Sequence, residues 1–332
     1  MKNRLMGFIL LTVLTCLNIS CDTSTDIVQV KLALDWYPNA NHIGLYIAQE
    51  KGYFEEENLK VEIYTPSDPS TVLQTVASGA DDFGMNYQPD VLIARSEGVP
   101  VISVLGMVQH PLNSIMALQS SGNKTPKDLK GKKVGYPGIP WNEDALNTML
   151  EADGLNGLED IELVNVGWEL GSAMISERVD AIIGAYFTHE SILLKNEGHP
   201  VNVMRMEEWG VPDYYELVMV TSEDYLSENA NVVGRFTRAV RKGYTDAISD
   251  PQTGVDILKK YAPEIDEDID RPGADLLQDL WKGKNGRFGT QEERRWVSFS
   301  NWMKARNIID ANLDPKAAFT DKFSSESGRW IK

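Results

Sequence analysis

The stretch that decides the fold is IVQVKLALDWYPNANHIGLYIAQEKG, at residues 27–52. Apolar residues occupy every second position from Val28 to Leu34, which is the period of a β-strand. A loop rich in aromatic and amide side chains follows, and apolar residues then return at helical spacing until Lys51 and Gly52 form a helix stop. A strand followed directly by a helix is the unit from which parallel α/β sheets are built.

This strand-helix unit recurs along the chain in two separate series. The first continues with strand patterns at residues 61–64 and 82–85, and the second runs from a strand pattern at 133–136 to another at 179–184. An apolar run at 217–220 returns the chain to the first series, and mostly helical patterns follow. We therefore predict a two-lobe α/β clamshell with mostly parallel sheets and two crossover strands.

The expected boundaries follow from these two series. Lobe 1 is predicted to comprise residues 27–112 together with 222–332, and lobe 2 residues 113–221. Ligands of such folds bind at the carboxyl ends of the strands, which here face the cleft between the lobes.

The first residues have the features of a secretory leader. Lys2 and Arg4 precede an apolar run at residues 5–17, which is too short to span a bilayer of about 30 Å as a helix. The segment before Cys21 resembles the cleavage site of bacterial lipoproteins, although Asn18 stands where that pattern prefers Leu. We predict a lipoprotein-type signal peptide at residues 1–20 and lipidation of Cys21, hence an exported periplasmic or cell-surface protein held to the membrane by its lipid alone. A secretory leader with an incidental Cys is the alternative.

Composition excludes several classes of function. The chain has 332 residues, 42% of them apolar, and its 32 Lys and Arg against 49 Asp and Glu give a net charge of −17. An acidic chain lacks the basic surface that binds phosphate backbones, so nucleic acid is not an expected partner. The two cysteines, Cys16 and Cys21, both lie in the leader region, so the body of the chain has no disulfide, cysteine metal site or cysteine nucleophile.

Signatures of catalysis are missing from the sequence. It contains no glycine-rich nucleotide motif, no metalloprotease motif and no serine nucleophile elbow, and its four histidines show no metal-ligand spacing. We therefore predict no catalytic residue, no metal site and no cofactor.

Four loops that follow strands carry aromatic and amide side chains instead. They lie at residues 35–41, 86–90, 135–143 and 185–190, at the same end of their sheets. Flat aromatic faces beside hydrogen-bonding edges suit a planar, polar heterocycle. The alternative is that individual aromatics, such as Trp36, pack in the core or at the hinge.

Five segments carry a specific family resemblance. They are LDWYPNANHIGLYIA at 34–48, KGYF at 51–54, GKKVGYPG at 131–138, DAIIGAY at 180–186 and PDYYEL at 212–217. These segments resemble the ThiY-like solute-binding proteins for thiamin pyrimidine precursors, in the family that also contains the fungal thiamin-pyrimidine synthase. The resemblance covers nearly the whole chain after the leader.

The resemblance implies a clamshell of the type II periplasmic-binding-protein kind and a receptor that serves an ABC importer, with a permease and an ATPase as partners. It implies an aminopyrimidine ligand, N-formyl-4-amino-5-aminomethyl-2-methylpyrimidine or a close relative. Relatives bind riboflavin precursors and sulfonates, so these solutes remain alternatives.

An enzyme like the fungal synthase is the rival hypothesis. That enzyme has a cysteine cluster in the loop corresponding to residues 212–217, and a Lys and a His in the loop corresponding to 85–90. This chain has tyrosines in the first loop, and Asn86 and Asp90 in the second. We therefore predict a receptor rather than an enzyme, with a sensor role as a further alternative.

We expect the ring of the ligand to stack between Trp36 and either Tyr186 or Tyr215, and Glu190 to accept from the exocyclic amine, with Glu216 as the next candidate. His189 should face away, because consecutive residues of an extended segment point to opposite sides. Glu190 could instead simply cap the helix that follows it. The predicted ligand-binding residues are Trp36, Asn39, Asn86, Gly138, Tyr186, Glu190, Tyr215 and Glu216.

Overall fold

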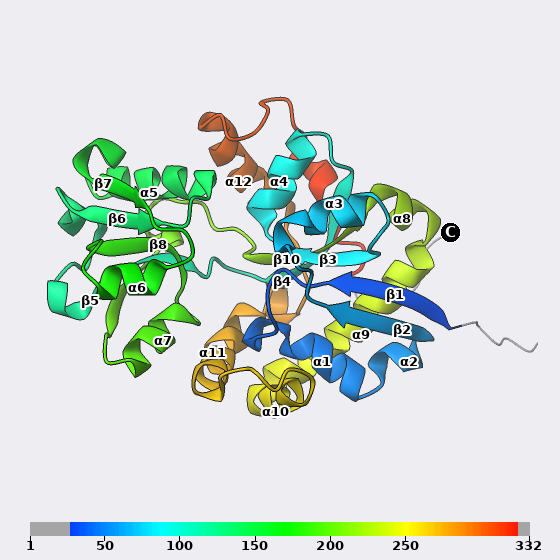
Figure 1. The fold of residues 1–332 in the computed structure, drawn as a ribbon. Helices are drawn as coiled ribbons and strands as arrows, with labels where there is room; N and C mark the ends of the chain where they lie inside the picture. Colours follow the sequence, from blue (N-terminus) through cyan, green and yellow to red (C-terminus); the bar gives the residue numbers. More distant parts are fainter. Residues whose placement is uncertain (1–26, 325–332) are drawn as a thin grey trace, which may run out of the picture.

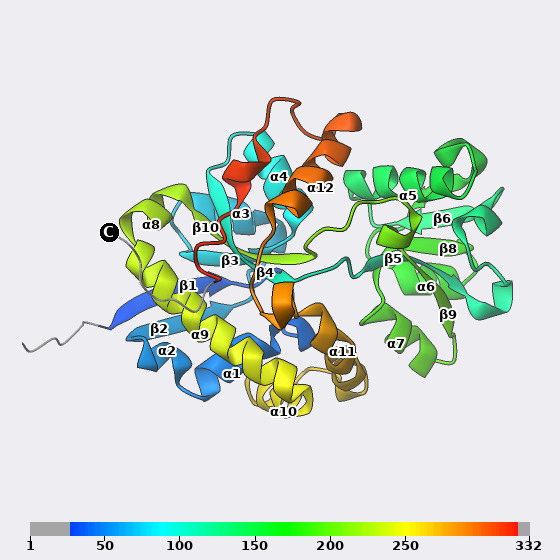
Figure 2. The same cartoon turned by 180° about the vertical axis from the view of Figure 1, so that it is seen from behind.

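A computed structural model of the chain describes residues 27–324 (Figure 1). The predicted signal peptide and Cys21 lie outside the described residues. Two five-stranded sheets, each covered by helices, form two lobes that lie side by side (Figures 1 and 2). The predicted two-lobe α/β architecture is therefore confirmed.

Lobe 1 contains the sheet with strand order β2-β1-β3-β10-β4. Neighbouring strands pair in parallel from β2 to β3, whereas β10 pairs antiparallel with both β3 and β4. Four strands thus run in one direction and β10 runs in the other. The strands are β1 Val28–Ala33, β2 Leu59–Tyr64, β3 Phe83–Asn86, β4 Val101–Val108 and β10 Leu217–Ser222.

Lobe 2 repeats this arrangement with the order β7-β6-β8-β5-β9. Here β5 is the reversed strand, since it pairs antiparallel with β8 and β9. In each lobe the reversed strand is therefore the one that enters from the crossing. The strands are β5 Asn113–Leu118, β6 Lys133–Tyr136, β7 Glu162–Asn165, β8 Ala181–Tyr186 and β9 Val201–Arg205.

Helices cover both faces of each sheet (Figure 1). In lobe 1, α3, α4 and α12 lie above the sheet and α1, α9, α10 and α11 lie below it (Figure 1). Lobe 1 has α1 Ile43–Glu50, α2 Tyr53–Glu56, α3 Val72–Ala77, α4 Gln88–Ser96, α8 Glu223–Glu228, α9 Ala230–Ser249, α10 Pro251–Tyr261, α11 Glu267–Leu280 and α12 Glu293–Ala305. Lobe 2 has α5 Pro140–Ala152, α6 Leu170–Ile175 and α7 Glu190–Asn196.

The first helix is locked against α9 by close backbone packing. A Cβ at Gly243 would lie 2.0 Å from the carbonyl oxygen of Gly44, and a Cβ at Gly44 would lie 2.3 Å from the Tyr244 ring. Only glycine at both positions allows the two helices to approach this closely. The Tyr244 hydroxyl then donates a 2.6 Å hydrogen bond to the carbonyl oxygen of Asn41, which fixes the loop between β1 and α1.

Two segments without regular secondary structure, 109–112 and 211–216, join the lobes. Strand β10 follows the second crossing and pairs within the first sheet. This pairing corrects the predicted boundary at 221, and we propose that lobe 1 resumes at Leu217. The apolar core continues through this hinge, where Tyr214 contacts Trp141 of α5 and Phe299 of α12 at ring-centroid distances of 5.8 and 4.7 Å.

The start of α12 differs from what the local sequence pattern suggests. The spacing of Thr290 and Glu293 is that of a capping box, but the helix begins at Glu293 and has Glu292 at its N-cap. The Thr290 hydroxyl instead accepts a 3.0 Å hydrogen bond from the backbone N–H of Lys284, because the preceding loop folds back onto it.

Candidate ligand-binding site at the lobe junction

The carboxyl ends of the strands bring residues of both lobes into contact. The indole rings of Trp36, after β1, and Trp168, after β7, have centroids 5.6 Å apart. Tyr186, the last residue of β8, donates a 2.8 Å hydrogen bond to Glu216 in the second crossing. The candidate site, called the junction site below, consists of Asp35, Trp36, Asn86, Tyr87, Asp90, Trp168, Tyr186, Glu190 and Glu216.

On the lobe 1 side, a chain of hydrogen bonds fixes the buried Asp35. The backbone N–H of Asn39 donates to Nδ1 of His42, so the proton of the neutral His42 ring lies on Nε2 and is donated to Asp35 at 3.0 Å. The Tyr87 hydroxyl donates to the other Asp35 oxygen, also at 3.0 Å. Because Asp35 precedes Trp36 directly, these bonds hold the backbone from which the indole projects.

Asn39 serves this same loop. Its side-chain Oδ1 accepts hydrogen bonds from both the backbone N–H and the side-chain amide of Asn41, at 2.9 Å each. Its amide Nδ2 donates to the carbonyl oxygen of Tyr37. The acceptor of Asn39 is therefore engaged within its own turn, as expected for an N-cap residue.

Glu216 lies at the hinge and is only 2% exposed. Its Oε2 accepts from the backbone N–H groups of Leu112, at the end of the first crossing, and Asn113, at the start of β5, and from the Tyr214 hydroxyl. Burial raises the pKa of Glu216, and these hydrogen bonds oppose the rise. Glu216 thus joins the two crossings and holds the Tyr186 ring by its hydroxyl.

Glu190 is the first residue of α7, and its carboxylate folds back toward β8. Oε2 accepts a 2.6 Å hydrogen bond from the backbone N–H of Tyr186, and Oε1 lies 2.9 Å from Nδ1 of His189. The two consecutive side chains therefore contact each other, which corrects the expectation that they point to opposite sides. Burial works against the charge of His189, but the hydrogen bond that its ring donates to Glu190 and the charges of nearby acids leave its pKa raised.

Asp90 lies in the first turn of α4, close to the hinge. No hydrogen bond or ion pair joins its carboxylate to another residue within 27–324. Burial raises the pKa of Asp90 to about 7, and the nearby charge of Glu216 adds to the rise. A partly exposed carboxyl group without a protein partner thus lies beside the buried carboxyl group of Glu216.

Two further predicted residues are fixed by local geometry. Asn86 ends β3, and its Oδ1 accepts a 2.9 Å hydrogen bond from the N–H of Tyr87. Gly138 follows β6 with φ of +84°, and a Cβ there would lie 2.8 Å from Nδ2 of Asn165. Gly138 therefore needs to be glycine both for its backbone conformation and for the close approach of Asn165.

Tyr215 does not lie with the other predicted residues, which corrects its expected position as a stacking face. It is fully buried in lobe 1, where the Arg295 guanidinium lies 4.5 Å from its ring centroid. Its hydroxyl accepts a 2.7 Å hydrogen bond from the N–H of Glu292. In an alternation of buried aromatics such as Tyr214 and Tyr215, the sequence does not show which one faces the hinge.

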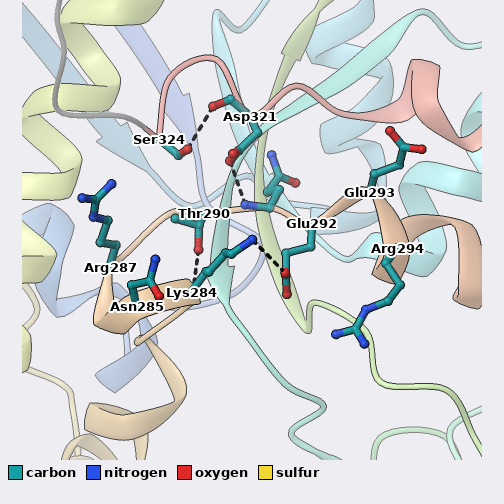
Figure 3. A pocket seen from close by; sticks show the side chains of 10 residues that line it. Lys284, Asn285, Arg287, Thr290, Glu292, Glu293, Arg294, Asp321 and Ser324 are labelled. Carbon is teal, nitrogen blue, oxygen red and sulfur yellow. Dashed lines mark hydrogen bonds and ion pairs between the residues drawn. The ribbon is translucent and has the colours of Figure 1, made fainter.

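A pocket of about 410 Å³ lies in lobe 1, and Glu292 is one of its lining residues (Figure 3). None of the junction residues lines it. Lys284 pairs with Glu292 across it at 3.7 Å, and Asp321 accepts a hydrogen bond from the N–H of Gln291. Its charged groups are thus partly matched by one another, and its lining residues all belong to lobe 1.

The junction site is acidic and aromatic. Four carboxyl groups lie in it, and across residues 27–324 no Lys or Arg forms an ion pair with any of them: Asp35, Asp90, Glu190 and Glu216. The described residues also contain no group of three or more His, Cys, Asp or Glu placed to hold a metal ion, and none of their helices is long and apolar enough to cross a membrane. Such a site can accept hydrogen bonds from a planar donor and stack on its ring.

Sequence reasoning missed four of these residues. Asp35, Tyr87 and Asp90 lie in loops that the sequence singles out, but nothing in their spacing distinguishes them from surface residues. Trp168 follows β7, whose loop has one aromatic residue and no cluster of amides that would mark it. Loops after parallel strands lie at the same edge of a sheet, and applying this rule to β7 would have included Trp168 among the candidate residues.

The comparisons with known proteins agree with this fold. A family model described as NMT1/THI5 like matches residues 39–254. Over 327 residues the chain is 38% identical to the formylaminopyrimidine-binding protein of Halalkalibacterium halodurans, covering 96% of this chain and 99% of the relative. The chain belongs to the NMT1/THI5-like family, which confirms the resemblance found in its sequence.

The family contains both binding proteins and enzymes. The chain is 27% identical to the 4-amino-5-hydroxymethyl-2-methylpyrimidine phosphate synthase of Aspergillus parasiticus, over 91% of this chain and 88% of that one. Among solved structures, the alkanesulfonate-binding protein of Xanthomonas axonopodis pv. citri superposes with a TM-score of 0.67 at 14% identity, covering 90% of this chain and 99% of that one. The fold is therefore that of the periplasmic binding proteins.

Proposed function

We propose that this protein is an extracytoplasmic solute-binding receptor of an ABC importer and that it captures a thiamin pyrimidine precursor between its lobes. The ligand is N-formyl-4-amino-5-aminomethyl-2-methylpyrimidine or a close relative with the same 4-aminopyrimidine ring. The formylaminopyrimidine-binding relative at 38% identity supports this choice.

The observation that carries the proposal is the charge of the junction site. Its ionisable groups are carboxyl groups and tyrosines, without a paired Lys or Arg in the described chain. A sulfonate or a phosphate needs cationic or N–H donors around it, and carboxylates repel it. An aminopyrimidine instead presents an amine that donates and a ring that becomes cationic on protonation, so it matches an acidic site.

Each lobe supplies part of the proposed contacts. Trp36 from lobe 1 and Tyr186 from lobe 2 give the stacking faces, and Tyr186 takes this role because Tyr215 is buried elsewhere. Glu190 accepts from the exocyclic amine, while Asn39, Asn86 and the Gly138 backbone supply polar contacts at the edge of the ring. A ligand held by both lobes binds the closed state better than the open one, and this difference drives closure.

Glu216 has a structural role in this proposal. All its hydrogen bonds go to the two crossings and to Tyr186, so it fixes the geometry of the hinge rather than reading the ligand. It remains the next candidate for the amine if Glu190 does not fill that role.

Delivery requires partners outside this chain. The proposed partners are the permease and ATPase subunits of an importer, and the proposed attachment to the membrane is a lipid on Cys21 alone. An enzyme like the fungal synthase is the second candidate, since the family includes such synthases. The absence of cysteine in the body of the chain argues against it, because the fungal cysteine cluster has no counterpart at Tyr214 and Tyr215.

Titration calorimetry of the purified protein tests the proposal. The panel comprises the formylated and hydroxymethyl 4-aminopyrimidines, riboflavin and taurine. We expect binding of the pyrimidines and no heat from taurine. Binding of taurine or riboflavin without binding of the pyrimidines would overturn the ligand and leave the family assignment in place.

A further inference from the structure

Three exposed aromatic rings gather where the lobes meet. Trp36 is 41% exposed, Tyr37 66% and Trp168 68%, and the described residues include few other large apolar side chains with such exposure. Tyr37 lies edge-on to Trp36 with a centroid distance of 5.7 Å, and Trp168 contacts Trp36 at 5.6 Å with an interplanar angle of 46°. Trp36 is thus flanked by one ring from its own lobe and one from the other.

Only one of the two ring contacts of Trp36 depends on how close the lobes are. Tyr37 is adjacent to Trp36 in the chain, so their contact persists whether the lobes are open or closed. Trp168 lies between β7 and α6 in lobe 2, after Gly167 with φ of +58°. Its contact with Trp36 therefore exists only while the lobes are close together.

We infer that Trp168 is a positioning residue that packs across the lobe boundary on Trp36, holds that indole over the bound ring and slows the opening of the lobes. The inference rests on the proposed function, in which Trp36 stacks on the ligand. Exposed indoles lose apolar contact with water when they pack together, and such aromatic pairs contribute beyond the area that they bury.

The expected effect is on release of the ligand. Opening breaks the Trp36–Trp168 contact, so loss of the contact should raise the rate of opening and leave the encounter rate nearly unchanged. An aromatic pair at an exposed position corresponds to about a 2- to 10-fold change in an equilibrium or a rate. Trp168→Ala should therefore release ligand about 2- to 10-fold faster, and Trp168→Phe should restore much of the parent rate.

Tyr37→Ala is the matched control. It removes a ring that contacts Trp36 at nearly the same distance, but from the same lobe. If any neighbour of Trp36 sufficed to orient the indole, Tyr37→Ala would accelerate release as much as Trp168→Ala. If the Trp36–Trp168 contact between the lobes slows release, only Trp168→Ala changes both the release rate and the closure of the lobes.

The experiment combines stopped-flow release of N-formyl-4-amino-5-aminomethyl-2-methylpyrimidine with a distance measurement between the lobes. The body of the chain lacks cysteine, so spin labels can be placed at Ser67→Cys and Lys195→Cys, which are exposed positions on lobe 1 and lobe 2. Circular dichroism checks the fold and also records the exciton couplet of two adjacent indoles, which needs no ligand.

The expected result is a couplet in the parent that disappears in Trp168→Ala, a broader interlobe distance and faster release, with Tyr37→Ala like the parent. Unchanged release and distance in Trp168→Ala, or equal effects of both variants, would overturn the inference. Failure of the parent to bind any pyrimidine refutes the proposed function instead, and the couplet and distances still decide whether Trp168 holds the lobes together. A parent without a couplet, with or without pyrimidine, also overturns the inference.

Discussion

The hydroxyl of Tyr186 donates a 2.8 Å hydrogen bond to Oε1 of Glu216, which ties the end of β8 in lobe 2 to the segment that leads back into lobe 1. Glu216 also accepts hydrogen bonds from the backbone N–H groups of Leu112 and Asn113. One buried carboxylate thus bonds both to the hinge and to one proposed ligand-stacking ring. Closure of the lobes and the position of the Tyr186 ring are therefore coupled through a single group.

Tyr186→Phe separates these two roles. It keeps the ring but leaves a buried Glu216 oxygen without its donor, so we expect the free energy of unfolding to fall by about 1 to 2 kcal/mol. Affinity for the pyrimidine should change by less than about threefold, because the stacking face remains. Urea denaturation and calorimetry measure the two effects, and a large loss of affinity with unchanged stability would contradict this assignment. Tyr186→Ala should weaken binding strongly.

Glu190→Gln tests the proposed acceptor for the amine. Loss of a buried, charge-assisted hydrogen bond should weaken binding by about 30- to 100-fold, or about 2 to 3 kcal/mol. Glu197→Gln is the control, since Glu197 is exposed and lies just beyond the end of the same helix. Calorimetry that finds Glu190→Gln within about threefold of the parent would remove Glu190 from the site and leave Glu216 as the next residue to test.

Asp90→Asn tests the effect of a raised carboxyl pKa on stability. Between the ordinary pKa of Asp and about 7, the unfolded chain is ionised while Asp90 stays protonated in the folded protein. Stability is therefore lost as the pH rises through this window, at up to about 1.4 kcal/mol per unit, and the loss is complete above the folded pKa.

We therefore compare the free energy of unfolding of the parent with that of Asp90→Asn. The parent value, relative to the variant value, should be lower at pH 8 than at pH 4. Since Asp90 is partly exposed, solvent reduces the difference, and we expect about 1 to 2 kcal/mol. Denaturation curves of both proteins at the two pH values measure it. An equal stability difference at both would show that Asp90 titrates normally.

Gly138→Ala tests the close approach of Gly138, in the loop after β6, to the Asn165 side chain. The new Cβ would combine a left-handed backbone conformation with a 2.8 Å contact to Asn165. Gly122→Ala is the matched control, because Gly122 has a similar φ of +77° and a Cβ added there would meet no atom within 4 Å. We expect Gly138→Ala to lower the melting temperature further than Gly122→Ala and to weaken ligand binding, whereas equal shifts would show that Asn165 moves aside freely.

The strand-helix rhythm of the sequence predicts most of the fold for a physical reason. Alternation at residues 28–34 and the helix stop at Gly52 are local signals, and they reappear in the structure as β1 and α1. The end of lobe 2 is less visible, because an apolar run such as 217–220 suits a central strand of either sheet. Only the pairing of β10 with β3 and β4 decides which lobe it joins.

The candidate site is predictable in part for the same reason. Trp36 and Glu190 follow strands, Asn86 and Tyr186 are the last residues of strands, and the topology gathers strand ends at one edge. The burial of Tyr215 depends on packing within lobe 1 against Arg295, and the contact of Trp168 with Trp36 depends on the angle between the lobes. No local pattern contains that angle.

The central claim is that the junction site reads a 4-aminopyrimidine through a carboxylate. Calorimetry of the parent protein with 4-amino-5-hydroxymethyl-2-methylpyrimidine and with its 4-oxo analogue tests this most directly, because the analogue has a carbonyl acceptor in place of the amine donor. The account predicts at least about 30-fold tighter binding of the amine, since the oxo group places an acceptor against Glu190. Equal affinity for the two ligands would contradict it.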